Sequence, residues 1–165
     1  MTDIIHLQEI WDELARIAET LKTTLNLKGV YQGDYAFQPQ MGSIPDLVNG
    51  LWIHPTPEMT SEPSDLPHVL MQRYRFRCVY VRKISLNENP TKQMVAEVKQ
   101  IANAFMAQRH MPNIVGLPEY ARVLWLNVAS VDFQCQEDDF TSGIAADLKA
   151  VAFQVDVMVR TKVTT

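Results

Sequence analysis

The stretch Leu70–Lys83, LMQRYRFRCVYVRK, places three arginines at alternate positions among aromatic and β-branched residues. Alternate residues of a strand face the same side of a sheet, so Arg73, Arg75 and Arg77 are predicted on one face, about 6.6 Å apart at ~3.3 Å per residue. The opposite face receives Tyr74, Phe76, Cys78 and Tyr80. Val79 and Val81 continue the arginine side, so that face changes from charged to apolar. We therefore predict a long strand with a core-building half and an arginine half that projects from the body.

The length of 165 residues fits one domain, 1–165, large enough to bury an apolar core. Hydrophobic residues at 47% and charged residues at 21% indicate a globular chain. Because 15 basic residues face 19 acidic ones, a surface that coats nucleic acid throughout is not expected, and only a local basic patch remains open. The first residues, MTDIIHLQEIWDELARI, lack a basic n-region, and no apolar run of 18 residues follows. A cytoplasmic setting without a membrane is expected.

Hydrophobic periodicity predicts the remaining elements. Amphipathic helices are expected over 2–25, capped by Thr2 or Asp3 and stopped at Asn26 and Gly29, and over 90–109, with Asn89 as N-cap and Pro90 in the first turn. Strands are expected over 28–35, 47–53, 122–134 and 151–163, the last two paired antiparallel. Four prolines in 54–68 predict a long exposed loop. The predicted fold is α+β, a mostly antiparallel sheet with two helices on one face.

Catalytic motifs are scarce. Phosphate-binding glycine loops and nucleophile elbows do not occur, and the four histidines lack metal-ligand spacing. Asp46 with Glu97 and Lys99 loosely resembles the acidic residue and Glu-x-Lys pair of nucleases, but the predicted helix places Glu97 and Lys99 about 160° apart at ~100° per residue. The acidic run 137–139 fits a solvated surface. Cys78 and Cys135, without Cys-x-x-Cys spacing, fit buried small hydrophobes. No enzyme activity, metal or cofactor is expected.

Three interpretations of the arginine strand remain open. The arginines can form a solvated or cross-strand-paired face, with Asp132 or Asp156 as partners. They can bind phosphate, although three arginines on an acidic chain are a thin electrostatic footprint. They can also contact a neighbouring subunit, since arginine and aromatic residues are enriched in protein interfaces. The last interpretation assigns Arg73, Arg75, Arg77 and Tyr74 to a subunit or partner interface.

The order of elements and the scarcity of catalytic motifs resemble the tail terminator or tail completion proteins of long-tailed bacteriophages. The segments that carry this resemblance are Asp3–Leu25, Leu51–Ile53 followed by Pro55, Tyr74–Lys83, Pro90–Gln108, Val123–Gln134 and Val151–Val163. The resemblance is one of pattern over almost the whole chain. It brings no motif that matches residue by residue, so it assigns no functional residue.

The resemblance implies a structural role in the virion. Subunits, six of them, would form a homo-oligomeric ring at the head-proximal end of the tail, assembled in the host cytoplasm. One side of the ring would meet the tail tube protein and the other the head–tail connector or neck proteins, and DNA would pass through the lumen without sequence-specific binding. Two alternatives stay open: a metal-dependent nuclease or other DNA-associated enzyme, and a cellular α+β protein-binding module that uses the proline-rich loop.

Overall fold

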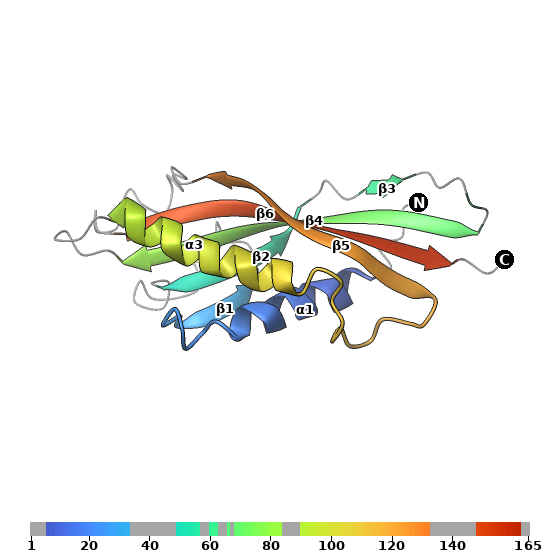
Figure 1. Cartoon of the computed structure of the whole chain (residues 1–165), viewed down its shortest axis with the longest axis horizontal. Helices are drawn as coiled ribbons and strands as arrows, with labels where there is room; N and C mark the ends of the chain where they lie inside the picture. The colour runs from blue at the N-terminus through green and yellow to red at the C-terminus, as the bar shows by residue number, and fades with distance from the viewer. Residues whose placement is uncertain are drawn as a thin grey trace.

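The computed structural model describes residues 6–33, 49–56, 60–62, 66, 68–83, 90–132 and 148–162. Within these residues the chain forms two helices and a mixed sheet of six strands, mostly antiparallel, which confirms the predicted α+β class (Figure 1). The helices are α1, Leu7–Glu19, and α3, Pro90–Ala107. The strands are β1, Gly29–Gln32; β2, Gly50–Pro55; β3, Thr60–Glu62; β4, Val69–Lys83; β5, Ala121–Asp132; and β6, Leu148–Lys162.

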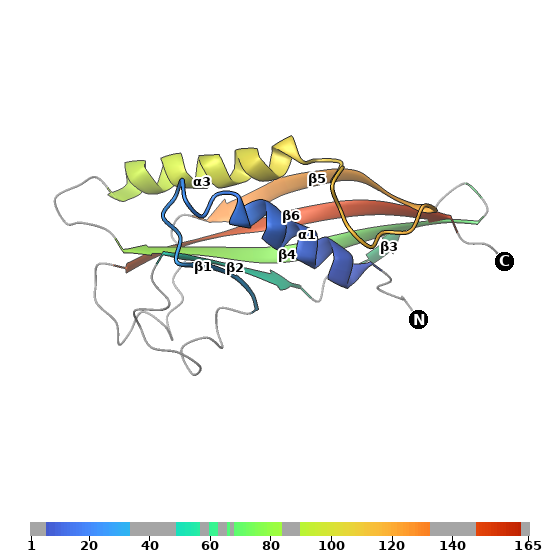
Figure 2. The same ribbon diagram turned by 90° about the horizontal axis from the view of Figure 1, so that it is seen from below.

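Both helices pack on the same face of the sheet, called here the helix face (Figure 2). The apolar stripe of each helix meets strand residues of one parity, as the alternation of a strand requires. The helices contribute Ile10, Leu14, Ile17, Met94, Val98, Ile101 and Phe105 to this core, and the two longest strands contribute Tyr74, Phe76, Cys78, Tyr80, Val151, Phe153, Val155, Val157 and Val159. Burial of each large apolar side chain stabilises the fold by about 1.5–3 kcal/mol. The periodic spacing of apolar residues in the helices and strands therefore leads both helices to pack on one face of the sheet.

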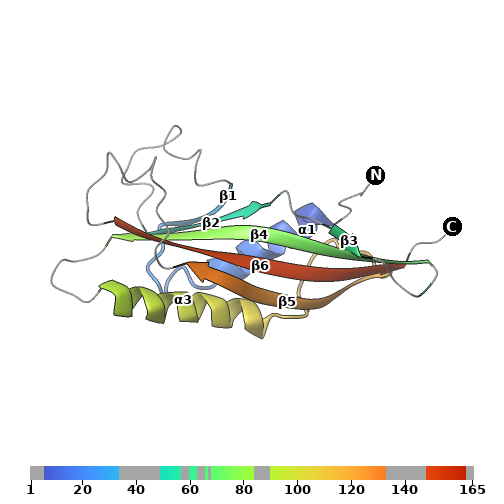
Figure 3. The same cartoon turned by 90° about the horizontal axis from the view of Figure 1, so that it is seen from above.

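The strands follow the order β1-β2-β4-β6-β5, with β3 also paired to β4 (Figure 3). β4 pairs antiparallel with β6 along its whole length, from Val69 opposite Lys162 to Lys83 opposite Leu148. β5 and β6 pair antiparallel, as the sequence predicts for the closing strands. The three long strands continue past the ends of the helices (Figure 1). The arginine half of β4 lies toward that end, but inside the sheet, between β6 and the strands β2 and β3.

Part of the predicted loop over 54–68 is a strand. β2 extends through Pro55, and β3 pairs with β4, Thr60 opposite Arg73 and Glu62 opposite Met71. The physical reason is the length of β4. Because β2 covers β4 only from Phe76 to Val81, the next backbone groups of that edge need another partner, and β3 supplies it. Residues 57–59, 63–65 and 67 lie outside the described part of the chain.

The parallel pairing of β1 with β2 was not predicted. Facing glycines, Gly29 and Gly50, start the two strands. A Cβ on Gly50 would lie 2.6 Å from the Trp52 ring, and one on Gly29 equally close to Tyr31. The glycines thus make room for the stacked rings of Tyr31 and Trp52, whose centroids are 4.7 Å apart.

The helix boundaries differ from the predicted ones at α1 and agree at the start of α3. α1 ends at Glu19 and is followed by turns, because the LKTTLN segment is rich in threonine, a poor helix former. The turns close in a Schellman motif: Leu27 N–H donates to the Lys22 carbonyl at 2.9 Å, and Asn26 has φ 53°. Pro90 begins α3 as predicted. The predicted caps Thr2, Asp3 and Asn89 lie outside the described residues.

Candidate functional site

The sheet face opposite the helices carries the three arginines of β4 and is called here the arginine face. Arg75 lies directly opposite Asp156 of β6, and its guanidinium donates to both carboxylate oxygens, Nε to Oδ1 at 2.9 Å and Nη2 to Oδ2 at 3.3 Å. The side chains are 24% and 11% exposed. This two-pronged pairing orients Arg75 and offsets the cost of the half-buried charge. The predicted cross-strand pairing with Asp156 is thus confirmed for the middle arginine.

Arg73 and Arg77 share the arginine face with Arg75, because all three occupy alternate positions of β4. The guanidinium carbon of Arg73 is 5.6 Å from the centroid of the Trp125 ring, a cation–π distance. The buried Met158 of β6 lies between Arg73 of β4 and Trp125 of β5 in the same row of the sheet. Arg77 is half-buried in the row between His54 of β2 and Gln154 of β6. The arginine face therefore presents arginine and tryptophan, two residue types enriched in protein interfaces.

Tyr74 has almost no surface to offer a partner, because its side chain is buried in the helix-face core with 1% exposure. Its hydroxyl donates to Gln72 Oε1 at 2.7 Å and accepts from the His6 backbone N–H at 3.2 Å. Burial raises the pKa of Tyr74, so the hydroxyl stays protonated. The alternation that exposes the arginines sends Tyr74 inward, and the residue serves to hold the start of α1. Direct partner contact thus falls to the arginines.

His6 completes that buried polar group. Its Nε2 lies 2.9 Å from Thr161 Oγ1, and the residue is almost fully buried. Burial lowers the pKa of His6, because the charged imidazolium would lose its hydration. The neutral ring links α1 to the end of β6. Local sequence patterns do not predict this pairing, because His6 and Thr161 are 155 residues apart.

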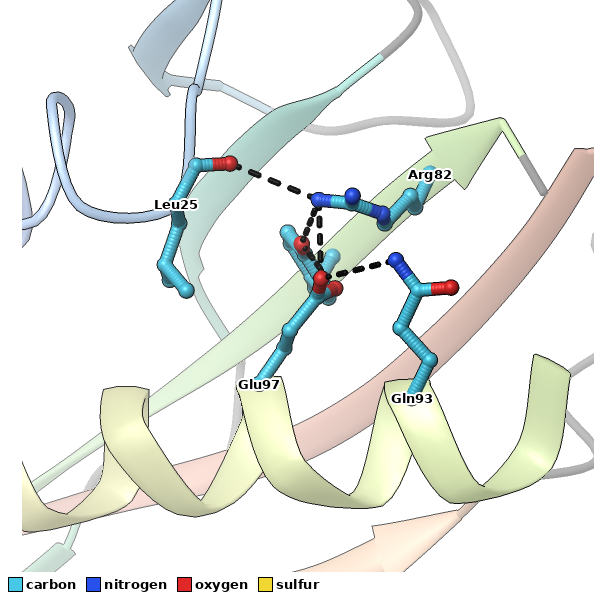
Figure 4. Close-up of polar contacts among 5 residues, drawn as sticks. Leu25, Arg82, Gln93 and Glu97 are labelled. Carbon is cyan, nitrogen blue, oxygen red and sulfur yellow. Dashed lines mark hydrogen bonds and ion pairs between the residues drawn. The ribbon is translucent and has the colours of Figure 1, made fainter. Parts of the chain in front are cut away.

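A second polar group, called here the polar clamp, joins β4, α3 and the turn after α1 (Figure 4). Arg82 Nη1 lies 2.8 Å from Glu97 Oε1, and Tyr80 donates to Glu97 Oε2 at 2.6 Å. Gln93 also donates to Glu97, and Arg82 reaches the Leu25 carbonyl at 3.4 Å. Burial and the hydrogen bond to Glu97 raise the pKa of Tyr80. The polar clamp thus pairs the charges of Arg82 and Glu97 where α3 packs on β4.

These contacts give Glu97 a structural environment. Its carboxylate is occupied by the clamp, while Lys99 is exposed on the same helix, so the two do not converge, as predicted. Within the described ranges no group of three His, Cys, Asp or Glu side chains is placed to hold a metal ion. Asp46, the acidic run 137–139 and Cys135 lie outside those ranges. Cys78 is buried as predicted, and burial raises the pKa of its thiol.

Sequence reasoning missed the polar clamp, although a signal for it existed. Glu97 falls on the apolar side of its helix, beside Met94, Val98 and Ile101. An acidic residue in that position needs a buried partner. Arg82 shares the strand face of Tyr80 and therefore points toward the helices. Glu97 and Arg82 are both charged residues on apolar sides of their elements, and they fit each other as an ion pair. This pairing can be predicted only when the packing of α3 on β4 is known.

No helix within the described residues is long and apolar enough to cross a membrane. The candidate site is the arginine face, on the side of the sheet opposite the helices. Neither protein-family models nor the curated proteins give a match to this chain.

Proposed function

We propose that this chain is a structural virion protein, a tail terminator or tail completion protein that forms a ring at the head-proximal end of a phage tail. The observation that carries the proposal is the arginine face, where Arg73, Arg75, Arg77 and Trp125 lie half-buried on the side of the sheet opposite the helices. Its composition is that of a protein interface. The order of helices and long strands, which resembles that protein family, supports the same assignment.

A ring requires a heterologous contact, in which one surface of a subunit meets a different surface of the next. The arginine face suits this geometry because the chain is asymmetric: helices cover one side of the sheet and arginines occupy the other. In the proposal six chains close the ring. One side of the ring binds the tail tube protein, the other side binds the neck proteins, and DNA passes through the lumen. The chain acts in the virion without catalysing a reaction.

End capping of tail tubes tests this proposal. Tubes polymerised from the tail tube protein encoded in the same genome are mixed with the gold-labelled chain and imaged by electron microscopy. The proposal predicts label at one end of each tube and arrest of further growth at that end; the label alone, without the chain, serves as the control. Label along the tube walls, or tubes that bind none, would contradict the proposal.

A further inference from the structure

The sheet brings three basic side chains together at the end where the long strands pass the helices. Arg122 of β5 lies directly opposite Arg160 of β6, and Lys162 follows Arg160 on the same side of the strand. Ala121 and Val123 belong to the helix-face core, so Arg122 between them faces the other way. We call Arg122, Arg160 and Lys162 the basic tip. It continues the arginine face beyond Arg73.

Within the described part of the chain, the basic tip has no counterion. Arg75 is held by Asp156 and Arg82 by Glu97, but the three side chains of the tip make no ion pair or hydrogen bond within the described part of the chain. Like charges directly opposite each other on antiparallel strands are destabilising. Arg122 and Lys162 are exposed, and Arg160 is half-buried. The fold thus keeps a concentration of positive charge that an external anion would neutralise.

An exposed aromatic residue stands beside these charges. The backbone N–H of Lys162 donates to the Tyr120 carbonyl at 2.9 Å, which extends the β5–β6 ladder and sets Tyr120 opposite Lys162. The Tyr120 side chain is 55% exposed. Arginine, lysine and tyrosine side chains are common donors to nucleic-acid phosphates.

The charge distribution distinguishes a polyanion from a protein partner. Among the side chains that the structure describes, the arginine face around the Val69–Arg77 half of β4 has six basic positions and one acidic position, Asp156. The basic positions are Arg73, Arg75, Arg77, Arg122, Arg160 and Lys162, so this half-face has a formal charge of +5. The other charged side chains of the described part balance, with seven basic and seven acidic residues. This local excess of positive charge attracts a polyanion. Protein interface cores are instead depleted of charged residues, which fits the paired arginines of β4 better than the unpaired tip.

We propose that the basic tip binds the phosphate backbone of double-stranded DNA without sequence preference. The binding is a property of the single chain and does not require the ring. In the ring of the proposed function, the duplex that passes through the lumen supplies this ligand. The contact is weak for one chain, because the tip makes only three phosphate contacts and each of them releases only about one counterion.

Fluorescence anisotropy of a labelled 30-base-pair duplex at rising salt tests the inference. Three phosphate contacts give a slope of log affinity against log salt of about −2.7, or a loss of about 40-fold between 50 and 200 mM salt. The tip variant is R122Q/R160Q/K162Q. The matched control, K92Q/K99Q/R109Q, removes the same charge from exposed positions on the helix side. We expect the tip variant to lose most of the salt slope and the control to keep it.

Thermal melting distinguishes a loss of DNA binding from misfolding, and light scattering distinguishes it from a change in assembly. Because the tip variant removes the repulsion between Arg122 and Arg160, it should melt at the same or a higher temperature than the wild type. R122K/R160K should retain the salt slope. Light scattering on each sample reports the oligomeric state, so a failure to form rings is recorded apart from a failure to bind DNA. Equal losses in the tip and control variants, no salt-dependent binding by the wild type, or binding of poly-glutamate in preference to DNA would overturn the inference.

Discussion

His6 shows how a single buried residue ties stability to pH. Its ring contacts Thr161 across the chain, and its backbone N–H donates to Tyr74, so protonation of the ring would place a charge in a nearly dry environment. In the unfolded chain the His6 ring is exposed to water, so its protonation does not carry this cost. The titration of His6 is therefore linked to folding.

The pH dependence of stability follows from the lowered pKa of His6. Because the unfolded chain binds the proton near the ordinary value of 6.5 and the folded chain only at lower pH, the free energy of unfolding should fall as pH decreases below about 6.5. Urea titrations between pH 8 and pH 5 measure this loss. In His6→Gln, which keeps a polar group beside Thr161 but does not titrate, the loss over this range should be smaller. Parallel profiles for the two proteins would show that His6 contributes nothing to it.

The polar clamp works at the scale of elements, because it fixes α3 on β4 and on the turn after α1. Replacing Glu97 with alanine removes the carboxylate that pairs with the Arg82 charge and accepts a hydrogen bond from the Tyr80 hydroxyl. We expect a loss of about 3 kcal/mol in the free energy of unfolding, the lower end for a broken buried pair, since the Arg82 side chain keeps 20% exposure. Chemical denaturation measures it.

Gln100→Ala is the matched control for this change, because Gln100 is exposed on the same helix. Its effect should stay within about 0.5 kcal/mol. If Glu97→Ala were as mild as this control, the clamp would be a consequence of helix docking and not one of its causes.

Elements were also the scale at which the sequence was most informative. Both helices, the long strand and the closing antiparallel pair follow from hydrophobic period and proline content, which are local signals. β3 and the parallel β1–β2 pair could not be predicted. A three-residue strand has no period, and β3 forms by pairing with the edge of a 15-residue strand. The candidate site was predictable in part: alternation placed the three arginines on one face, but the partners Asp156 and Trp125 depend on register.

At the scale of the whole molecule, the arginine face is the surface on which assembly is proposed to depend. The test variant replaces Arg73, Arg75 and Arg77 with serine and Asp156 with asparagine, so that no buried carboxylate is left unpaired. The variant should fold with an unchanged far-UV circular dichroism spectrum and assemble at least tenfold more weakly. Sedimentation velocity over a concentration series measures the assembly, with K92Q/K99Q as the control at exposed helix positions. Unchanged assembly would return the arginines to a solvated, internally paired face.

If copies of this chain close into a ring, the mass of the protein in solution will show it. Size-exclusion chromatography with multi-angle light scattering, run over a range of protein concentrations, measures that mass without a reference shape. We expect a closed species of six chains of 18.8 kDa each, which does not grow further as the concentration rises. A mass of 18.8 kDa at every concentration would contradict it.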